Sequence, residues 1–121
     1  MTHRRRPPDR RYSESVDFVF GDNERIIYTA TVGYHHDGAP AELFLTCNKA
    51  GSGADAVARD AAYVFSLAVQ YGCPIDVIRS GLLRGNGDAK AGVLGCALDE
   101  LDAAGGLAPR VAWVVSAGEP T

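Results

Sequence analysis

Cysteine is scarce in this chain of 121 residues, which has no CxxC pair and holds only Cys47, Cys73 and Cys96. An odd set of spaced cysteines argues against a disulfide framework or a zinc site and favours free thiols in a reducing compartment. Long apolar runs are also missing, since no stretch approaches the roughly 18 residues that a membrane-spanning helix needs. The arginines near the N-terminus are not followed by the apolar segment of a secretory signal. We therefore expect a cytoplasmic protein with no membrane span, no metal and no cofactor.

Charge is unevenly distributed along the chain. The 12 basic and 15 acidic residues give a net charge of -3, yet the first 11 residues hold five arginines and one acidic residue, Asp9. The remaining residues hold 7 basic and 14 acidic groups, and the length suits one globular domain that needs no disulfide or metal to fold. The pattern predicts a disordered basic arm over residues 1–11, in front of an acidic domain over residues 12–108.

Three segments after the arm carry the patterns of β-strands. Residues 12–20 alternate as in a half-buried strand, with one face made of Val16, Phe18 and Phe20. Residues 25–34 are rich in β-branched and aromatic side chains, and residues 41–48 place two leucines on one face. Short turns separate the three segments, so they predict an antiparallel meander.

The longest predicted helix follows a glycine-rich turn and lies between Lys49 and Gly72. Ser52 precedes Asp55 by three residues, which is the spacing of a helix N-cap, and Gly72 can close the helix in a left-handed conformation. One apolar face recurs at helical spacing and is expected to be covered: Val57, Ala61, Val64, Phe65 and Ala68, widened by Ala58, Ala62 and Val69. A narrow polar wedge is expected to face water: Arg59, Ser66 and Gln70.

Two shorter helices are predicted next, over residues 74–83 and 91–104. A strand-like run, Val111–Val115, lies in a tail over residues 109–121 and would add a short edge strand or pack against a partner. The order of elements predicts an α+β domain in which three helices pack on one face of a three-stranded antiparallel meander.

After the meander come Lys49–Gly51 at the start of a helix, then Ser66–Ala68, Gly72–Asp76 and Gly92–Cys96. Together these segments resemble the TSCPD domain. The resemblance covers about residues 11–104, and its most specific part is Lys49 to Ile78. Domains of this family form the C-terminal appendage of adenosylcobalamin-dependent ribonucleotide reductases and also occur as short stand-alone proteins.

Departures from the family pattern bear on what the resemblance implies. The namesake Thr-Ser-Cys-Pro-Asp is replaced by Leu94-Gly95-Cys96-Ala97-Leu98, so only the cysteine remains. Arg84–Asp88 stands where the reductase appendages can carry metal ligands, and the large reductase barrel has no counterpart in the chain. The resemblance therefore implies a non-catalytic accessory module rather than a ribonucleoside-diphosphate reductase.

Such a module is expected to act by association. The apolar breadth of the predicted central helix and the spare strand around Trp113 suggest a homodimer. The resemblance also implies a ribonucleotide-reductase-like protein as a partner.

The turn before the long helix is a candidate anion or nucleotide site, made of Lys49, Gly51, Ser52 and Gly53. Free N–H groups at a helix N-terminus, together with a lysine, can cradle a phosphate. The alternative, which we favour, is that the glycines allow a tight turn and that Ser52 only caps the helix.

A nucleic-acid surface is the alternative function, and it would use Arg4, Arg5, Arg6, Arg10, Arg11, Arg79 and Arg84. Residues 68–78 have roughly the spacing of a helix-turn-helix, and an arginine arm can contact phosphates. Asp76 in the would-be reading helix and the acidic domain oppose this function, because both repel phosphate.

Two further groups of residues could bind a metal or act as a reactive thiol. His35, His36 and Asp37 could join Cys47 around a metal, but neighbouring strand residues point to opposite faces, so we predict no metal site. Cys96, near a predicted helix start, could be a reactive thiol, although packing as a small apolar residue is the commoner role. We predict no catalytic residue.

Overall fold

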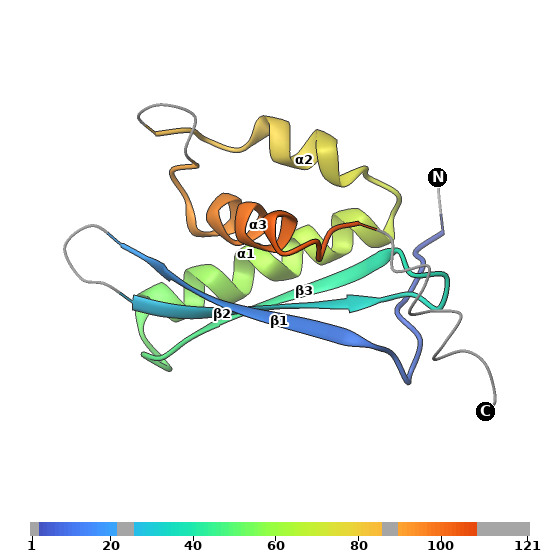
Figure 1. Ribbon diagram of the computed structural model, residues 1–121, viewed down its shortest axis with the longest axis horizontal. Helices are drawn as coiled ribbons and strands as arrows, with labels where there is room; N and C mark the ends of the chain where they lie inside the picture. Colours follow the sequence, from blue (N-terminus) through green and yellow to red (C-terminus); the bar gives the residue numbers. More distant parts are fainter. Residues whose placement is uncertain (1–2, 22–25, 86–89, 109–121) are drawn as a thin grey trace.

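The computed structural model describes residues 3–21, 26–85 and 90–108 (Figure 1). Its elements are β1 (Ser13–Phe20), β2 (Ile26–Tyr34), β3 (Pro40–Cys47), α1 (Gly53–Gln70), α2 (Ile75–Gly81) and α3 (Val93–Ala103). The strands form one antiparallel sheet in the order β1-β2-β3, and the helices lie on one side of it. The predicted α+β architecture is confirmed. The predicted strand-like run at Val111–Val115 lies outside the described residues.

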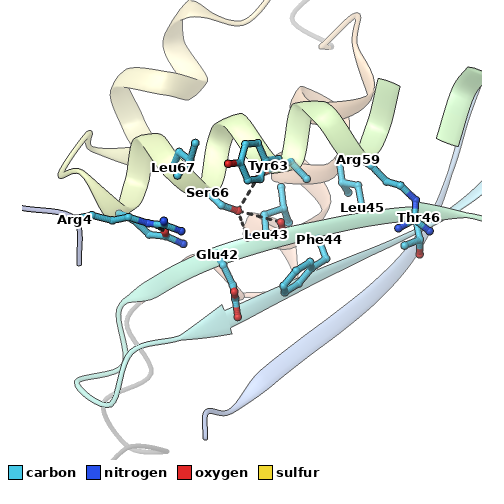
Figure 2. A pocket seen from close by; sticks show the side chains of 12 residues that line it. Arg4, Glu42, Leu43, Phe44, Leu45, Thr46, Arg59, Tyr63, Ser66 and Leu67 are labelled. Atoms are coloured by element: carbon cyan, nitrogen blue, oxygen red, sulfur yellow. Dashed lines mark hydrogen bonds between the residues drawn. The ribbon is translucent and has the colours of Figure 1, made fainter. Parts of the chain in front are cut away.

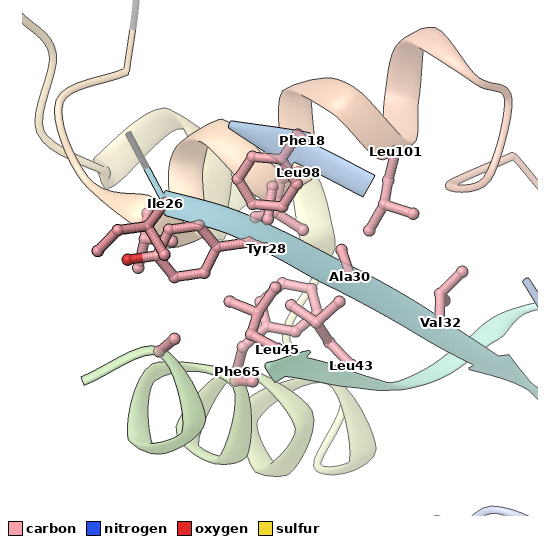
Figure 3. Packing of buried hydrophobic residues seen from close by; sticks show 14 of the residues in the cluster. Phe18, Ile26, Tyr28, Ala30, Val32, Leu43, Leu45, Phe65, Leu98 and Leu101 are labelled. Carbon is pink, nitrogen blue, oxygen red and sulfur yellow. The ribbon is translucent and has the colours of Figure 1, made fainter. Parts of the chain in front are cut away.

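The core lies between the sheet and the helices (Figure 3). Because strand side chains alternate between the two faces, every second residue of each strand points toward the helical layer. Members of this buried cluster come from strands and from α1 and α3, and they include Phe18, Tyr28, Leu45, Phe65 and Leu98. The hydroxyl of Tyr34, itself fully buried, donates to the carbonyl of Gly106 at 2.7 Å, which ties β2 to the chain after α3.

The buried face of α1 differs from the predicted one. Val57 and Val64, expected in the core, are 64% and 63% exposed, whereas Ser66 and Gln70, expected to face water, are buried. The buried residues of α1 are Asp55, Ala58, Ala62, Phe65, Ser66 and Gln70. The cause is the position of α1 against β3, an edge strand whose outer backbone groups need polar partners.

Both ends of α1 form as the sequence predicts. The Ser52 hydroxyl oxygen accepts the N–H of Asp55 at 3.2 Å, so Ser52 is the N-cap. After the last turn Gly72 has a φ of 94°, which an L side chain rarely adopts, and its N–H donates to the carbonyl of Val69 at 3.0 Å.

Residues 3–11, predicted to be a disordered basic arm, contact the domain at several points. The backbone N–H of Arg5 donates to the carbonyl of Gln70 at 2.7 Å, at the end of α1. The Arg5 guanidinium pairs with Asp37 at 2.8 Å, and that of Arg11 pairs with Glu42. This segment lies against the domain because its positive charges meet carboxylates of the acidic body.

The second and third helices are joined by ion pairs. Arg79 of α2 donates to Asp99 at 2.8 Å and lies 3.3 Å from Asp102, both on α3. α2 is short and has no fully buried residue. Across the three described ranges, every helix falls short of the length and apolar character that crossing a membrane would require.

Candidate functional site

The outer edge of β3 is closed by polar side chains of α1. In an antiparallel strand, alternate residues turn both backbone groups toward the same edge. The N–H of Leu43 donates to the Ser66 hydroxyl oxygen at 2.8 Å, and that hydroxyl lies 3.1 Å from the Leu43 carbonyl. Gln70 Nε2 donates to the carbonyl of Ala41 at 3.0 Å. The polar residues on the inner face of α1 therefore supply several of the hydrogen bonds that a fourth strand would make.

A cavity of about 360 Å³ lies beside this closed edge, between α1 and β3 (Figure 2). We call it the edge cavity, and its residues include Arg4, Glu42, Phe44, Arg59, Tyr63 and Gln70. The volume is within the range of small-molecule sites. Small residues of α1, such as Ala62 and Ser66, face the strand there and leave this space.

Two aromatic rings and two guanidinium groups define the chemistry of the edge cavity. Tyr63 of α1 and Phe44 of β3 both line it, and Figure 2 shows Arg4 and Arg59 toward its two ends. Both rings are partly exposed, Phe44 to 49% and Tyr63 to 63%. Planar apolar walls with terminal cations suit a ligand that has a flat body and an anionic group.

Both arginines are held by buried partners. Arg4 Nε donates to Gln70 Oε1 at 2.7 Å, and Arg59 Nε donates to Asp55 Oδ2 at 2.9 Å. These bonds use one N–H of each guanidinium and leave the terminal amino groups for another anion. The hydrogen bond from Arg59 is the main reason that the pKa of the Asp55 carboxyl lies below its usual range. Glu42 is the acidic member of the cavity lining, and Arg11 balances its charge.

The turn predicted to bind an external anion already binds the carboxylate of Asp55. Asp55 Oδ2 accepts the N–H of Gly51, and Asp55 Oδ1 accepts the N–H of Cys47, both at 3.3 Å. An external phosphate at Lys49, Gly51, Ser52 and Gly53 would have to displace this carboxylate. The structure thus brings these four residues together at one turn. Their arrangement is that of the alternative in which the glycines allow a tight turn and Ser52 caps the helix.

The arginines predicted to bind nucleic acid do not share one surface role. Four have carboxylate or amide partners: Arg4, Arg5, Arg11 and Arg79. Arg84 also has an interaction partner, whereas Arg6 and Arg10 are exposed. Because Arg79 points to α3, α2 does not present it as a reading helix would, and this weakens the helix-turn-helix hypothesis.

The histidine turn and Cys96 have structural surroundings. His35 is buried, and burial is the main reason that its pKa is lowered, whereas His36 Nε2 lies 2.9 Å from the carbonyl of Arg10. Burial raises the pKa of the Cys96 thiol, with Glu100 and Asp99 adding to the effect, which is the opposite of a reactive thiol. No group of three His, Cys, Asp or Glu residues suited to a metal occurs in residues 3–21, 26–85 and 90–108.

Sequence reasoning missed the edge cavity, although it singled out Arg4 for another role. Arg59 was expected only to face water, and Phe44 and Tyr63 carried no motif. The available signal was the pair of polar residues Ser66 and Gln70 at helical spacing from Ala62, which marks a polar inner face on α1.

Comparison with known proteins relates the chain to a ribonucleotide reductase. Over 75 residues, or 62% of the chain, it is 36% identical to a vitamin B12-dependent ribonucleotide reductase of Rhodopirellula baltica. The aligned part is only 7% of that reductase, so the chain is similar to a small segment of a much longer protein. No protein-family model and no solved structure matches the chain.

Proposed function

We propose that this chain is a non-catalytic accessory module of the TSCPD kind, which acts by binding a copy of itself or a ribonucleotide-reductase-like protein. The observation that carries the proposal is the 36% identity to a segment that makes up 7% of a reductase. A domain similar to so small a part of an enzyme is more readily an attached module than a complete catalytic unit.

The described polar groups support a binding role. Ser66, which could otherwise serve as a nucleophile, is committed to the backbone of β3. The raised pKa of Cys96 keeps its thiol protonated at neutral pH. On the outer side of α1, the apolar side chains of Val57 and Val64 are exposed. Exposed apolar side chains on one helix face are typical of surfaces that bind another protein.

Native mass measurement of the purified chain tests association directly. We expect a dimer at micromolar concentration, or a stable complex when a reductase-like protein is supplied. A chain that stays monomeric and binds no such protein would contradict the proposal. Turnover of a ribonucleotide by the chain alone would contradict its non-catalytic part.

We also propose that the module responds to a nucleotide, and the edge cavity is the feature that favours this. A nucleobase can lie against Tyr63 or Phe44 while Arg59 binds the phosphate. A nucleoside triphosphate at 100 times its Kd would stabilise the fold by about 2.7 kcal/mol. For a domain of this size, that corresponds to a rise in Tm on the order of 10 °C.

Two variants separate this cavity from the turn predicted by sequence. If the edge cavity binds the nucleotide, Arg59→Gln removes most of the rise in Tm and Lys49→Ala leaves it unchanged. The reverse result would assign the nucleotide to the turn at Lys49–Gly53. Equal rises in all three proteins, or none, would reject both sites.

A further inference from the structure

Among the described residues, nothing pairs with the outer edge of β1. The N–H of Tyr34 donates to the carbonyl of Tyr12 at 3.0 Å, which fixes the phase of the β1–β2 ladder. Alternation then turns the backbone groups of the intervening residues outward, those of Ser13, Ser15, Asp17 and Val19. All four residues are exposed. The structure gives their N–H and C=O groups no partner within residues 3–21, 26–85 and 90–108.

The two edges of the sheet contrast sharply. At β3 the side chains of α1 satisfy the outward groups of Ala41, Leu43 and Cys47. At β1 the neighbouring helix is α3, and none of the described hydrogen bonds joins an α3 side chain to the β1 backbone. β1 contains no proline or lysine and pairs with β2 without a register shift, so of the devices that block edge pairing it has only the carboxylates of Glu14 and Asp17.

We propose that two copies of this chain pair through β1, antiparallel, into one sheet that continues across both copies. The inference rests on the self-association proposed above and names its surface. Because each copy has one open edge and one closed edge, pairing stops at two. A closed dimer follows rather than a fibre.

The sequence of β1 allows a favourable antiparallel register with a copy of itself. When the two-fold axis passes at Val16, Ser15 lies opposite Asp17 of the other copy, and Ser13 lies opposite Val19 of the other copy. The Ser15 hydroxyl of each copy can then donate to the Asp17 carboxylate of the other copy, and Val19, now 41% exposed, gains a neighbour. A two-fold axis at Asp17 would place two carboxylates face to face, which is unfavourable.

Proline at position 15 tests the surface. The Ser15 N–H points away from β2, so Ser15→Pro removes an edge donor without breaking the β1–β2 ladder. Ser15→Ala is the matched control, because it loses the same hydroxyl contact with Thr31, 2.6 Å long, but keeps the N–H. We expect sedimentation to give dimers for wild type and Ser15→Ala, and a folded monomer with unchanged circular dichroism for Ser15→Pro.

The other outcomes overturn distinct claims. If Ser15→Pro remains a dimer, the β1 surface is wrong while self-association stands. If wild type is a monomer at all micromolar concentrations, self-association itself is wrong. A wild-type monomer that captures an extended peptide at β1 would show that the edge is used by another protein.

Hydrogen exchange on wild type keeps the inference testable if Ser15→Pro does not fold. The amides of Ser15 and Asp17 should exchange at least 10-fold more slowly in the dimer than after dilution to the monomer. Amides of exposed residues at the tip of the β2–β3 turn, such as His36, serve as an internal control and should not change. Equal exchange of Ser15 and Asp17 at both concentrations would overturn the pairing.

Discussion

At the scale of single residues, this fold depends on polar side chains that are buried for structural reasons. Asp55, Ser66 and Gln70 lie on the inner face of α1 and are each less than a tenth exposed. Each one bonds an outward backbone group of β3. A buried N–H without a partner is costly, so these residues have the importance of core residues despite their polarity.

Ser66→Ala should therefore destabilise the fold. Removal of the hydroxyl leaves the buried N–H of Leu43 without its acceptor, and the expected loss is about 1–3 kcal/mol in the free energy of unfolding. Urea denaturation measures it. Ser80→Ala is the matched control, because the Ser80 hydroxyl bonds only the Val77 carbonyl on the exposed surface of α2, and its effect should stay within about 0.5 kcal/mol. Equal losses in both variants would contradict the capping role of Ser66.

Asp55 makes the stability of the fold depend on pH in the acidic range. The pKa of its carboxyl is lowered in the folded state, first by the hydrogen bond from Arg59. A lowered folded pKa means that the stabilisation is complete above the unfolded pKa, about 3.9, and is lost as pH falls through the folded value. Asp55→Asn should be less stable than wild type at pH 7, and the difference should shrink below about pH 4. Urea midpoints across this pH range check it, and a constant difference would contradict it.

At the scale of elements, the strands were easier to predict than the inner face of α1. Alternation in residues 12–20 and 41–48 follows directly from the two faces of a sheet, one buried and one open. The helix pattern was misleading because apolar periodicity assumes that polar side chains face water. Here the neighbour of α1 is a strand edge, which offers N–H and C=O groups and selects polar residues on the inner face. The edge cavity was hidden for a related reason, since its residues come from elements whose packing geometry the sequence does not specify.

Val64 provides a direct test of which face of α1 is buried. Because Val64 is 63% exposed, Val64→Glu should change the free energy of unfolding by no more than about 0.5 kcal/mol. Phe65, the next residue, is buried, and Phe65→Ala should cost about 3–5 kcal/mol. Chemical denaturation measures the change in the free energy of unfolding for both variants. A loss of several kcal/mol for Val64→Glu without a change in mass would restore the face predicted from sequence. The native mass should remain that of the dimer, because pairing through β1 does not use this face of α1.

At the scale of the whole molecule, the N-terminal segment connects elements that are far apart in sequence. Arg4 reaches the end of α1 and the edge cavity, Arg5 reaches the β2–β3 turn, and Arg11 reaches β3. Composition alone predicted a solvated arm, because the sequence shows the positive charges but not the position of their partners. The edge cavity, α1 and the sheet therefore share one set of ion pairs, which a change in this segment should affect together.

Substitutions in the ion pair of Arg11 and Glu42 test how the N-terminal segment is connected to the sheet. Glu42 is nearly buried and lies over Gly33, where a Cβ atom would collide with its side chain, whereas the Arg11 side chain is 30% exposed. Arg11→Ala leaves a buried carboxylate without its cation and should cost about 1–3 kcal/mol, less than a fully buried pair because solvent reaches the arginine. Glu42→Gln should lower the free energy of unfolding by less than Arg11→Ala does, because the freed guanidinium of Arg11 lies at the surface and becomes hydrated.

The double variant shows whether Arg11 and Glu42 stabilise the fold as an ion pair or independently of each other. Once Glu42→Gln has removed the buried charge, loss of Arg11 should cost little more, so the two single effects should sum to more than the double effect. Urea denaturation of the four proteins gives this coupling energy, and trypsin digestion at Arg10 and Arg11 reports whether the segment has been released. We expect faster cleavage in Glu42→Gln than in wild type. Additive effects together with unchanged cleavage would mean that the N-terminal segment is held by its backbone contact with Gln70 and not by charge.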